Sequence, residues 1–143
     1  MVAVSLKKKK QRNNKTNKKK KYIIKHEYNI LCVQRAPSKY DYISLKYEFP
    51  GGKVEQDETP EQAIIREIQE ELNMEIVVHS HLITVDYDYP DFSISLNTFL
   101  CRTNDKNLQL LEHVDYQWLT IDELTILDWA AADLPIVDKL QRK

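Results

Sequence analysis

The chain has 143 residues, of which 42% are hydrophobic, and this suits one domain with an apolar core of its own. No apolar run approaches the roughly 18 residues that a membrane-spanning helix needs. The N-terminus also lacks the order of a signal peptide, because its charges follow the apolar stretch. Cys32 and Cys101 stand in strand-like runs that favour buried, reduced thiols, and the four histidines show no metal-ligand spacing. We therefore expect a cytosolic protein.

The net charge of −1 conceals an uneven distribution along the chain. Residues 7–21 hold ten of the 21 Lys and Arg side chains and no acid, which leaves 11 basic against 22 acidic side chains elsewhere. Because residues 1–21 are also low in complexity, we expect most of them to form a disordered tail and residues 22–143 to form the domain. The alternative is an arm that contacts nucleic acid or anionic lipid. The acidic body suits an anionic substrate only if metal ions screen the contact.

Short apolar runs predict two strands, at residues 22–24 and 28–34. A loop over residues 36–45 and an extended piece at 46–49 follow. The next segment, Phe49-Pro50-Gly51-Gly52, must turn, and it contains the only two glycines of the chain. Glycine permits unusual backbone angles and a close approach of the backbone to a ligand. This turn is therefore a candidate part of a binding site.

A helix is predicted from residue 60 to about Leu72. Thr59 is suited to the N-cap, Pro60 to the first helical position and Gln62 to the return bond of a capping box. Asn73 is suited to a left-handed residue after the helix. The predicted buried stripe consists of Ile64, Ile65, Ile68 and Leu72.

The second half of the chain predicts more strands than helices. Alternating patterns favour strands at residues 75–87, 92–102 and 114–119. A second capping-box pattern at residues 120–123 predicts a short helix, and a last helix is predicted at 134–140 with Asp133 as its N-cap. The expected fold is a mixed sheet with helices on its faces.

Three carboxylates, those of Glu67, Glu70 and Glu71, fall on one face of the predicted helix. Like charges at this spacing repel and destabilise an isolated helix. A hard cation such as Mg²⁺ would neutralise them. The structural alternative is a solvent-exposed helix in which Arg66 pairs with Glu70.

The same helix and the glycine turn carry a family resemblance. The pattern resembles the Nudix signature, which is G, five residues, E, seven residues, R-E, an aliphatic residue, one residue, E-E, one residue, G and an aliphatic residue. The matching residues are Gly52, Glu58, Arg66, Glu67, Ile68, Glu70, Glu71 and Met74. Asn73 stands where the family has glycine, and Asn tolerates positive φ better than most residues.

The resemblance implies an α/β/α sandwich with a mixed, mostly antiparallel sheet, and hydrolysis assisted by Mg²⁺ or Mn²⁺. Bound metal shields phosphate charge and lowers the pKa of an attacking water. The implied metal ligands are Glu67, Glu70, Glu71 and the carbonyl of Gly51. Arg66 would orient these carboxylates, and Glu58 would brace the loop onto the helix. The resemblance does not settle which glutamate is the general base.

Residues 47–55 (YEFPGGKVE) and 58–63 (ETPEQA) are similar to the MutT branch of the family. That branch cuts (deoxy)nucleoside triphosphates to the monophosphate and pyrophosphate. The resemblance also implies that Glu112 is a further metal-binding or catalytic residue, beside Glu67, Glu70 and Arg66. Arg35, Gly52 and Lys53 are the implied contacts for the substrate phosphates, although Arg35 and Lys53 also suit surface ion pairs or solvation.

Asp133 is the candidate for reading the base. Residues 127–135 (LDWAAADLP) resemble the base-reading region of the branch, in which relatives that act on cytosine nucleotides carry aspartate. An ionised carboxylate accepts the N4 amino donor of cytosine, and a protonated one could also donate to an oxidised purine. Trp129 or Tyr47 could stack on the base, although both also suit the core.

The sequence therefore favours a metal-dependent hydrolase of modified dNTPs or of CTP. A capped RNA or a nucleotide sugar is the alternative substrate, and a non-catalytic nucleotide-binding module is the alternative class. The preferred base, the number of metals and the choice between monomer and homodimer stay open.

Overall fold

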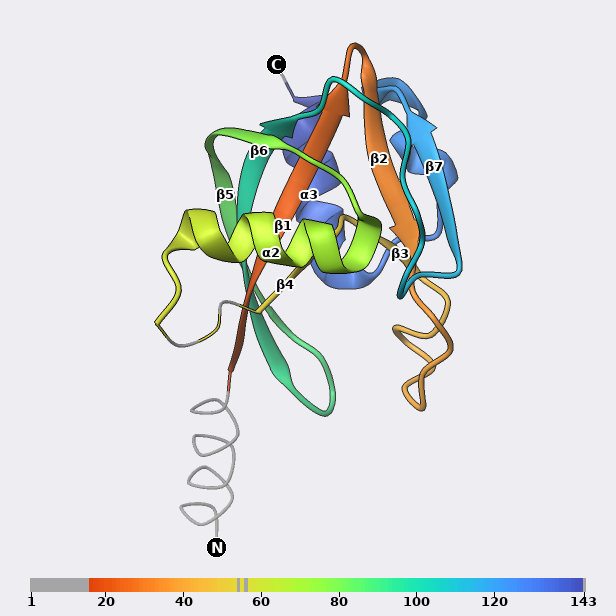
Figure 1. Ribbon diagram of the computed structural model, residues 1–143. Helices are drawn as coiled ribbons and strands as arrows, with labels where there is room; N and C mark the ends of the chain where they lie inside the picture. The colour runs from red at the N-terminus through yellow and green to blue at the C-terminus, as the bar shows by residue number, and fades with distance from the viewer. Residues whose placement is uncertain (1–15, 54, 56, 143) are drawn as a thin grey trace, which may run out of the picture.

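The computed structural model describes residues 16–53, 55 and 57–142, with the side chain of Pro60 excepted. Its centre is a seven-stranded sheet in which the strand order is β3-β2-β1-β6-β5, while β4 pairs with β1 and β7 pairs with β2. Helix α2 crosses one face of the sheet, and α3 lies on the other (Figure 1). The predicted α/β/α arrangement is confirmed.

The elements follow one another in the order β-β-β-β-α-β-β-β and then two short 3-10 helices and a last α-helix. Their bounds are β1 Asn17–His26, β2 Asn29–Gln34, β3 Tyr47–Glu48, β4 Gly51–Gly52, α2 Pro60–Leu72, β5 Val77–Asp88, β6 Ser93–Arg102, β7 Asp115–Leu119, η1 Ile121–Ile126, η2 Ala131–Asp133 and α3 Leu134–Gln141.

Strand β1 is the centre of the sheet. It pairs antiparallel with β2 and β4, and parallel with β6 in a register that opposes Lys19 to Leu96. All other strand pairs are antiparallel, so the sheet is mixed and mostly antiparallel, as predicted. Side chains of a strand alternate between the two faces. Tyr22 and Ile24 accordingly pack in the apolar cluster beneath α2, and Ile23 packs in the opposite cluster with Ile136 of α3.

The predicted tail is too long at its C-terminal end. Strand β1 begins at Asn17, so residues 17–21 belong to the fold and the domain begins before residue 22. The lysine run conceals the strand because its backbone partners come from β6 and β4, which the sequence does not place beside it. Residues 1–15 lie outside the described residues, and the tail stays a prediction for them.

Helix α2 begins and ends where its sequence predicts. Thr59 Oγ1 accepts a hydrogen bond from Gln62 N at 3.2 Å, and Gln62 Oε1 accepts one from Thr59 N at 3.0 Å. Asn73 follows the helix in the left-handed region, with φ 50° and ψ 49°. One predicted core position is wrong, because the Ile65 side chain is exposed at 65%. None of the helices in the described part of the chain is long and apolar enough to cross a membrane.

The predicted helix after Thr120 is a 3-10 helix instead of an α-helix. Glu123 nevertheless returns a bond to Thr120, since its Oε1 accepts from Thr120 N at 2.9 Å. The following 3-10 turn, η2, delivers Asp133 to the start of α3. These short elements set the position of Asp133 relative to the sheet.

Candidate active site

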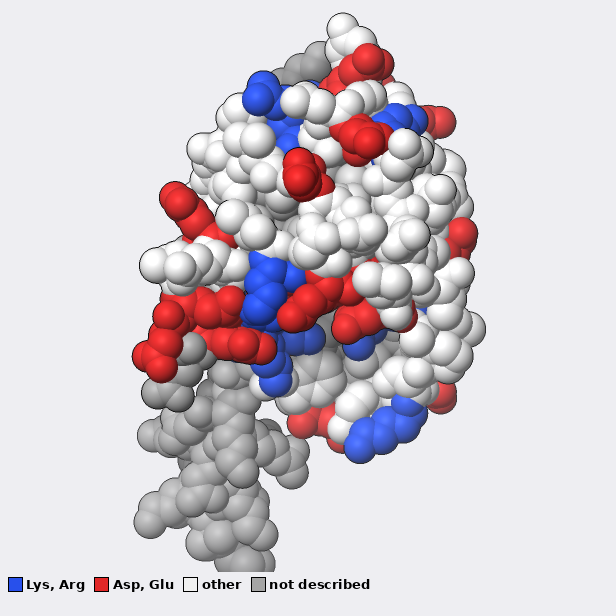
Figure 2. Space-filling view, viewed as in Figure 1, with Lys and Arg blue, Asp and Glu red and all other residues white. Residues whose placement is uncertain are grey.

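A cavity of about 430 Å³ opens between the N-terminal half of β1, the glycine turn and α2. Its lining is strongly charged, with basic groups from Lys19, Lys21, Arg35 and Lys53 and acidic groups from Glu48, Glu71 and Glu112. Figure 2 shows acidic and basic side chains interleaved in a band across the face that carries α2. The cavity brings together residues that lie far apart in the sequence, from Lys19 to His113.

Both glycines of the turn lie against close neighbours, which are backbone at Gly51 and the Glu67 side chain at Gly52. A Cβ atom at Gly51 would lie 2.0 Å from the carbonyl oxygen of Lys20, and one at Gly52 would lie 2.8 Å from Glu67 Oε2. Neither glycine has a positive φ, so their role is a close approach and not an unusual backbone angle. Gly52 thus brings the backbone of the turn against a carboxylate of α2.

Arg66 is held by Glu58. Its Nε donates to Glu58 Oε2 at 2.6 Å and its Nη2 donates to Glu58 Oε1 at 2.8 Å, which is a bidentate pair. Nη2 also donates to the carbonyl of Lys53 at 3.2 Å, so the arginine ties the loop to the helix. The Glu70 carboxylate lies on the exposed flank and accepts from Arg66 Nη1 at 3.1 Å.

Glu67 is almost fully buried, with 3% of the residue exposed. Its Oε2 accepts from the Tyr22 hydroxyl at 3.2 Å. Its Oε1 has no hydrogen-bond partner among the described residues, although Arg66 Nη2 lies 3.5 Å away. Burial raises the pKa of Glu67 to about 7, against the opposing effects of Tyr22 and Arg66.

Glu71 faces the cavity one helical turn further along α2. Its Oε2 is buried and likewise lacks a hydrogen-bond partner in the described part of the chain. Burial raises the pKa of Glu71 to about 8, and the nearby carboxylates of Glu112 and Glu48 raise it further. Glu112 itself is exposed at the mouth of the cavity.

The carboxylates of Glu67, Glu70 and Glu71 do not converge on one point in this structure. Among residues 16–53, 55 and 57–142, no three His, Cys, Asp or Glu side chains form a group that could hold a metal ion. The donor chemistry nevertheless fits Mg²⁺, because Glu67 Oε1 and Glu71 Oε2 are carboxylate oxygens without hydrogen bonds. Hard divalent cations prefer such oxygen ligands. The residues present therefore fit the metal that the helix pattern predicts.

Glu48 is the centre of a buried ion network that the sequence did not predict. Its Oε1 lies 2.7 Å from Lys21 Nζ and 3.1 Å from Arg35 Nη1, and its Oε2 lies 3.2 Å from His113 Nε2. Burial alone would raise the pKa of Glu48, but Lys21, His113 and Arg35 together hold that pKa well below its usual range. The sequence feature that could have predicted this network is Glu48, a charged residue directly before the glycine turn. Lys21 could not be recognised as its partner because it is one of several lysines in a row.

Asp133 stands at the N-cap position of α3, as predicted, but its side chain does not serve as the cap. No side-chain capping bond is present, and the Asp133 backbone is helical. Its Oδ2 instead accepts from Phe49 N at 2.9 Å and lies 3.7 Å from Lys21 Nζ. Burial raises the pKa of Asp133, while Lys21 opposes that rise. Asp133 therefore belongs to the same buried network as Glu48.

The two aromatic candidates for stacking are already engaged. Trp129 is buried, its ring centroid lies 4.6 Å from that of Phe49, and its Nε1 donates to the carbonyl of Leu124 at 2.6 Å. The hydroxyl of Tyr47 donates to Asp115 Oδ2 at 2.7 Å. Trp129 is thus a core residue that supports Phe49, whose backbone contacts Asp133.

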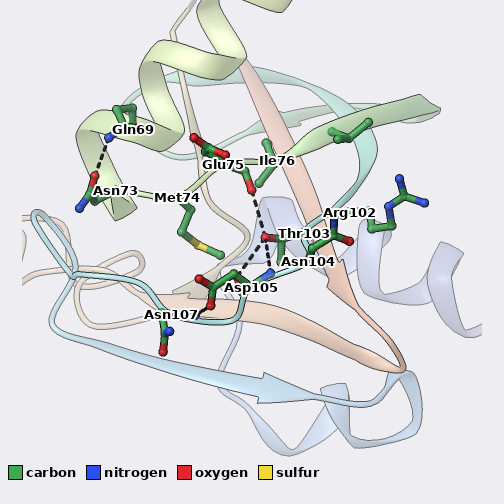
Figure 3. A pocket seen from close by; sticks show the side chains of 11 residues that line it. Gln69, Asn73, Met74, Glu75, Ile76, Arg102, Thr103, Asn104, Asp105 and Asn107 are labelled. Carbon is green, nitrogen blue, oxygen red and sulfur yellow. Dashed lines mark hydrogen bonds between the residues drawn. The ribbon is translucent and has the colours of Figure 1, made fainter.

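A second pocket, of about 440 Å³, lies beside the C-terminal end of α2 (Figure 3). Its polar groups are bonded to one another. Thr103 Oγ1 donates to the carbonyl of Glu75 at 3.0 Å, and Asp105 Oδ1 accepts from Asn107 N at 2.9 Å. This pocket shares no lining residue with the charged cavity, and we place no part of the site there.

The fold and the helix pattern together define a family. A model of the NUDIX domain matches residues 19–140, which is most of the chain, and the protein therefore belongs to the Nudix family. It is 33% identical to the 8-oxo-dGTP diphosphatase of Escherichia coli (strain K12) over 120 residues, covering 84% of this chain and 92% of that relative. It is 34% identical to the CTP pyrophosphohydrolase of the same organism over 116 residues, covering 81% and 84% of the two chains.

A solved structure agrees with this assignment. The solution structure of the DNA mismatch repair protein MutT, a Nudix hydrolase of methicillin-resistant Staphylococcus aureus 252, is 39% identical and superposes with a TM-score of 0.67. The match covers 88% of this chain and 95% of that one. The family resemblance of the sequence, including its MutT-like character, is confirmed.

Glu48→Gln should destabilise the protein by about 3 kcal/mol, because it leaves the buried Lys21 ammonium with only the more distant carboxylate of Asp133, at 3.7 Å. The pKa of Glu48 is depressed, so its contribution is present at neutral pH and is lost only as the pH falls below about 4. Urea denaturation at pH 7 measures the change. The control is Asp128→Asn, which breaks the exposed pair with Lys46 and should cost less than about 1 kcal/mol. Equal small losses in both variants would contradict a buried network.

The metal-free protein should lose stability as the pH rises. The pKa values of Glu67 and Glu71 are raised to about 7 and about 8, whereas an unfolded glutamate titrates near 4.3, so the folded state holds more protons between these values. The free energy of unfolding therefore falls with pH over this range. Added Mg²⁺ binds ionised carboxylates and should raise the unfolding temperature more at pH 8.5 than at pH 5.5. The double variant Glu67→Gln, Glu71→Gln is the control, and a full Mg²⁺ effect in it would contradict the assignment.

Proposed function

We propose that the protein hydrolyses (deoxy)nucleoside triphosphates, in particular oxidised or otherwise modified dNTPs or CTP, to the nucleoside monophosphate and pyrophosphate. The observation that carries this proposal is the charged cavity, which has the unbonded carboxylate oxygen of Glu71 from α2 on one side and cationic side chains on another. The names of the relatives, 8-oxo-dGTP diphosphatase and CTP pyrophosphohydrolase, support this substrate class. Two free, buried cysteines suit a reducing compartment, and we place the activity in the cytosol.

The residues proposed to hold Mg²⁺ or Mn²⁺ are Glu67, Glu70, Glu71, Glu112 and the carbonyl of Gly51. When bound, the metal supplies charge neutralisation of the phosphates and a more acidic water. Glu67 and Glu71 bring carboxylate oxygens that no hydrogen bond occupies in the described residues. Glu70 is exposed and accepts from Arg66 in this structure, so we propose that it would leave Arg66 to join the same group.

Arg66 and Glu58 keep the helix and the turn in place. Their bidentate pair and the bond from Arg66 to the Lys53 carbonyl fix the glycine turn against α2. Arg66 also lies 3.5 Å from Glu67 Oε1, so it favours the ionised form of that carboxylate. We propose that Arg66 orients Glu67 for catalysis and that Gly52 leaves room for this contact.

Arg35 and Lys53 are proposed to bind the substrate phosphates. Both line the cavity. Arg35 gives Nη1 to Glu48, while its Nε is buried and has no hydrogen-bond partner in the part of the chain described. An arginine with an unused donor suits a phosphate oxygen. Gly52 places the backbone of the turn at the cavity wall, where no side chain obstructs the substrate.

Asp133 is proposed to read the base together with the backbone of Phe49. One carboxylate oxygen, Oδ2, already accepts from Phe49 N. We propose that the other, Oδ1, accepts from a donor of the base. A buried carboxylate discriminates strongly between hydrogen-bond donors and acceptors, because an unpaired polar group is costly in such a site. A capped RNA or nucleotide sugar as preferred substrate, or a module without activity, are outcomes that the experiments below would reveal.

The Nudix helix should be essential for hydrolysis. We expect Glu70→Gln and Glu71→Gln to lower kcat/KM by about 100-fold, since each removes a charge that the metal and the transition state require. The measurement is pyrophosphate release from a panel of canonical, 8-oxo and 5-modified (d)NTPs with Mg²⁺. Glu61→Gln, on the exposed first turn of the same helix, is the matched control and should retain full activity. Hydrolysis at the full rate in both test variants would refute the proposal.

Asp133→Asn should change the order of preference among bases. The amide adds a donor where the carboxylate only accepts, so the ratio of kcat/KM between cytosine and guanine nucleotides should shift by about 10-fold. This ratio of kcat/KM values does not change if part of the variant is unfolded, because both substrates are measured with the same preparation. Asp128→Asn, an exposed aspartate nearby in sequence, is the control and should leave the ratio unchanged. If the order stays the same in Asp133→Asn, Asp133 supports the fold and does not read the base.

A further inference from the structure

Lys19 lies on the same face of β1 as Lys21 and Ile23. Alternation along the strand puts Tyr22 and Ile24 beneath α2 and puts residues of odd number on the opposite face. Both Lys19 and Lys21 line the charged cavity. The strand therefore projects two ammonium groups into one cavity, and both stand in the segment that the sequence suggested was a tail.

The two lysines differ in their partners. Lys21 donates to Glu48 Oε1 at 2.7 Å and to the carbonyl of Phe49 at 2.9 Å. No carboxylate of the described residues lies within 4 Å of Lys19 Nζ, so this ammonium group has no counter-ion there. Burial lowers the pKa of Lys19, and the charge of Lys21 lowers it further. Desolvating this ammonium group costs free energy, and the charge of Glu48, which lies beyond ion-pair distance, offsets only part of it because the pKa stays lowered.

The neighbouring lysines of β1 do not share the position of Lys19 in the charged cavity. Lys20 points to the α2 face, where its Nζ lies 5.1 Å from the centroid of the Phe99 ring. Lys18 is exposed to solvent. Lys19 alone among these three lines the charged cavity, as a half-buried cation.

Two of the cationic side chains that line the cavity have no carboxylate partner in the described part of the chain and are therefore open to an anionic ligand. Lys21 and Arg35 share Glu48, whereas neither Lys19 nor Lys53 has a carboxylate within 4 Å among the described residues. A polyphosphate carries several negative charges, and fixed cations in a cavity attract such a ligand and lower the cost of its desolvation. Lysine binds phosphate oxygens as a compact point charge.

We propose that Lys19 binds a phosphate oxygen of the substrate directly. This inference rests on the proposed function and adds to Arg35 and Lys53 a third cation that reaches the substrate from β1. The bound phosphate would supply the counter-ion that Lys19 lacks. The ammonium group would gain a charge-assisted hydrogen bond on binding, so its charge contributes to affinity and not to folding.

The test uses the full chain as wild type, Lys19→Gln, Lys19→Arg and the matched control Lys18→Gln. Dissociation constants for inorganic pyrophosphate and for a methylene-bridged, non-hydrolysable nucleoside triphosphate are measured by titration calorimetry with Mg²⁺ at two ionic strengths. Lys19→Gln should weaken both by about 10-fold and reduce the salt dependence. Lys19→Arg should retain most of the affinity, and Lys18→Gln should stay within about twofold of wild type. Thermal unfolding of each variant reports whether it is folded.

The possible results separate the role of Lys19 from the proposed function. If Lys19→Gln binds both ligands as Lys18→Gln does while the wild type hydrolyses nucleotides, this inference fails and the proposed function stands. The unphosphorylated nucleoside is titrated in the same way. If Lys19→Gln weakens its binding as much as that of the triphosphate analogue, Lys19 contacts the base or sugar and the inference also fails. If the wild type hydrolyses no nucleoside triphosphate, the proposed function fails, and pyrophosphate binding by the variants still decides the role of Lys19.

Discussion

The buried carboxylate of Glu48 is the constraint on which the rest of the site depends. It gathers Lys21 from β1, Arg35 from the end of β2 and His113 from the loop before β7. A carboxylate removed from water is stable only when such partners surround it, so these three segments must meet at one point. Lys21 then donates to the carbonyl of Phe49, and the backbone of β1 bonds to Pro50, which fixes the glycine turn at the cavity wall.

The Nudix helix is arranged by a second ion pair, that of Arg66 with Glu58. Arg66 gives its hydrogen bonds to Glu58, Glu70 and the Lys53 carbonyl, while Glu67 Oε1 and Glu71 Oε2 have no hydrogen bond in the described structure. Burying carboxylates in this way raises their pKa values and works against folding. Perturbed ionisable groups of this kind cluster at functional sites, and here Glu71 lines a cavity that has cations on another side.

Local patterns predicted the parts of this arrangement that are local. The capping box at Thr59, the left-handed Asn73 and most strands follow from residues within a few positions of one another. Two predictions failed because a distant partner decided the outcome. The lysine run became a strand since β6 and β4 supplied its backbone bonds, and the Asp133 side chain does not cap α3 since it accepts from Phe49 N instead.

The sequence by itself determined the family, the acidic helix and the glycine turn, because all three depend on spacing along one continuous segment. Only the tertiary structure decided that Glu48 is the centre of a buried network, that Asp133 joins it and that Lys19 reaches the cavity. The physical reason is that charge compensation and burial depend on distances across the sheet. The partners of Glu48 stand 27, 13 and 65 residues away along the chain, where no local pattern connects them.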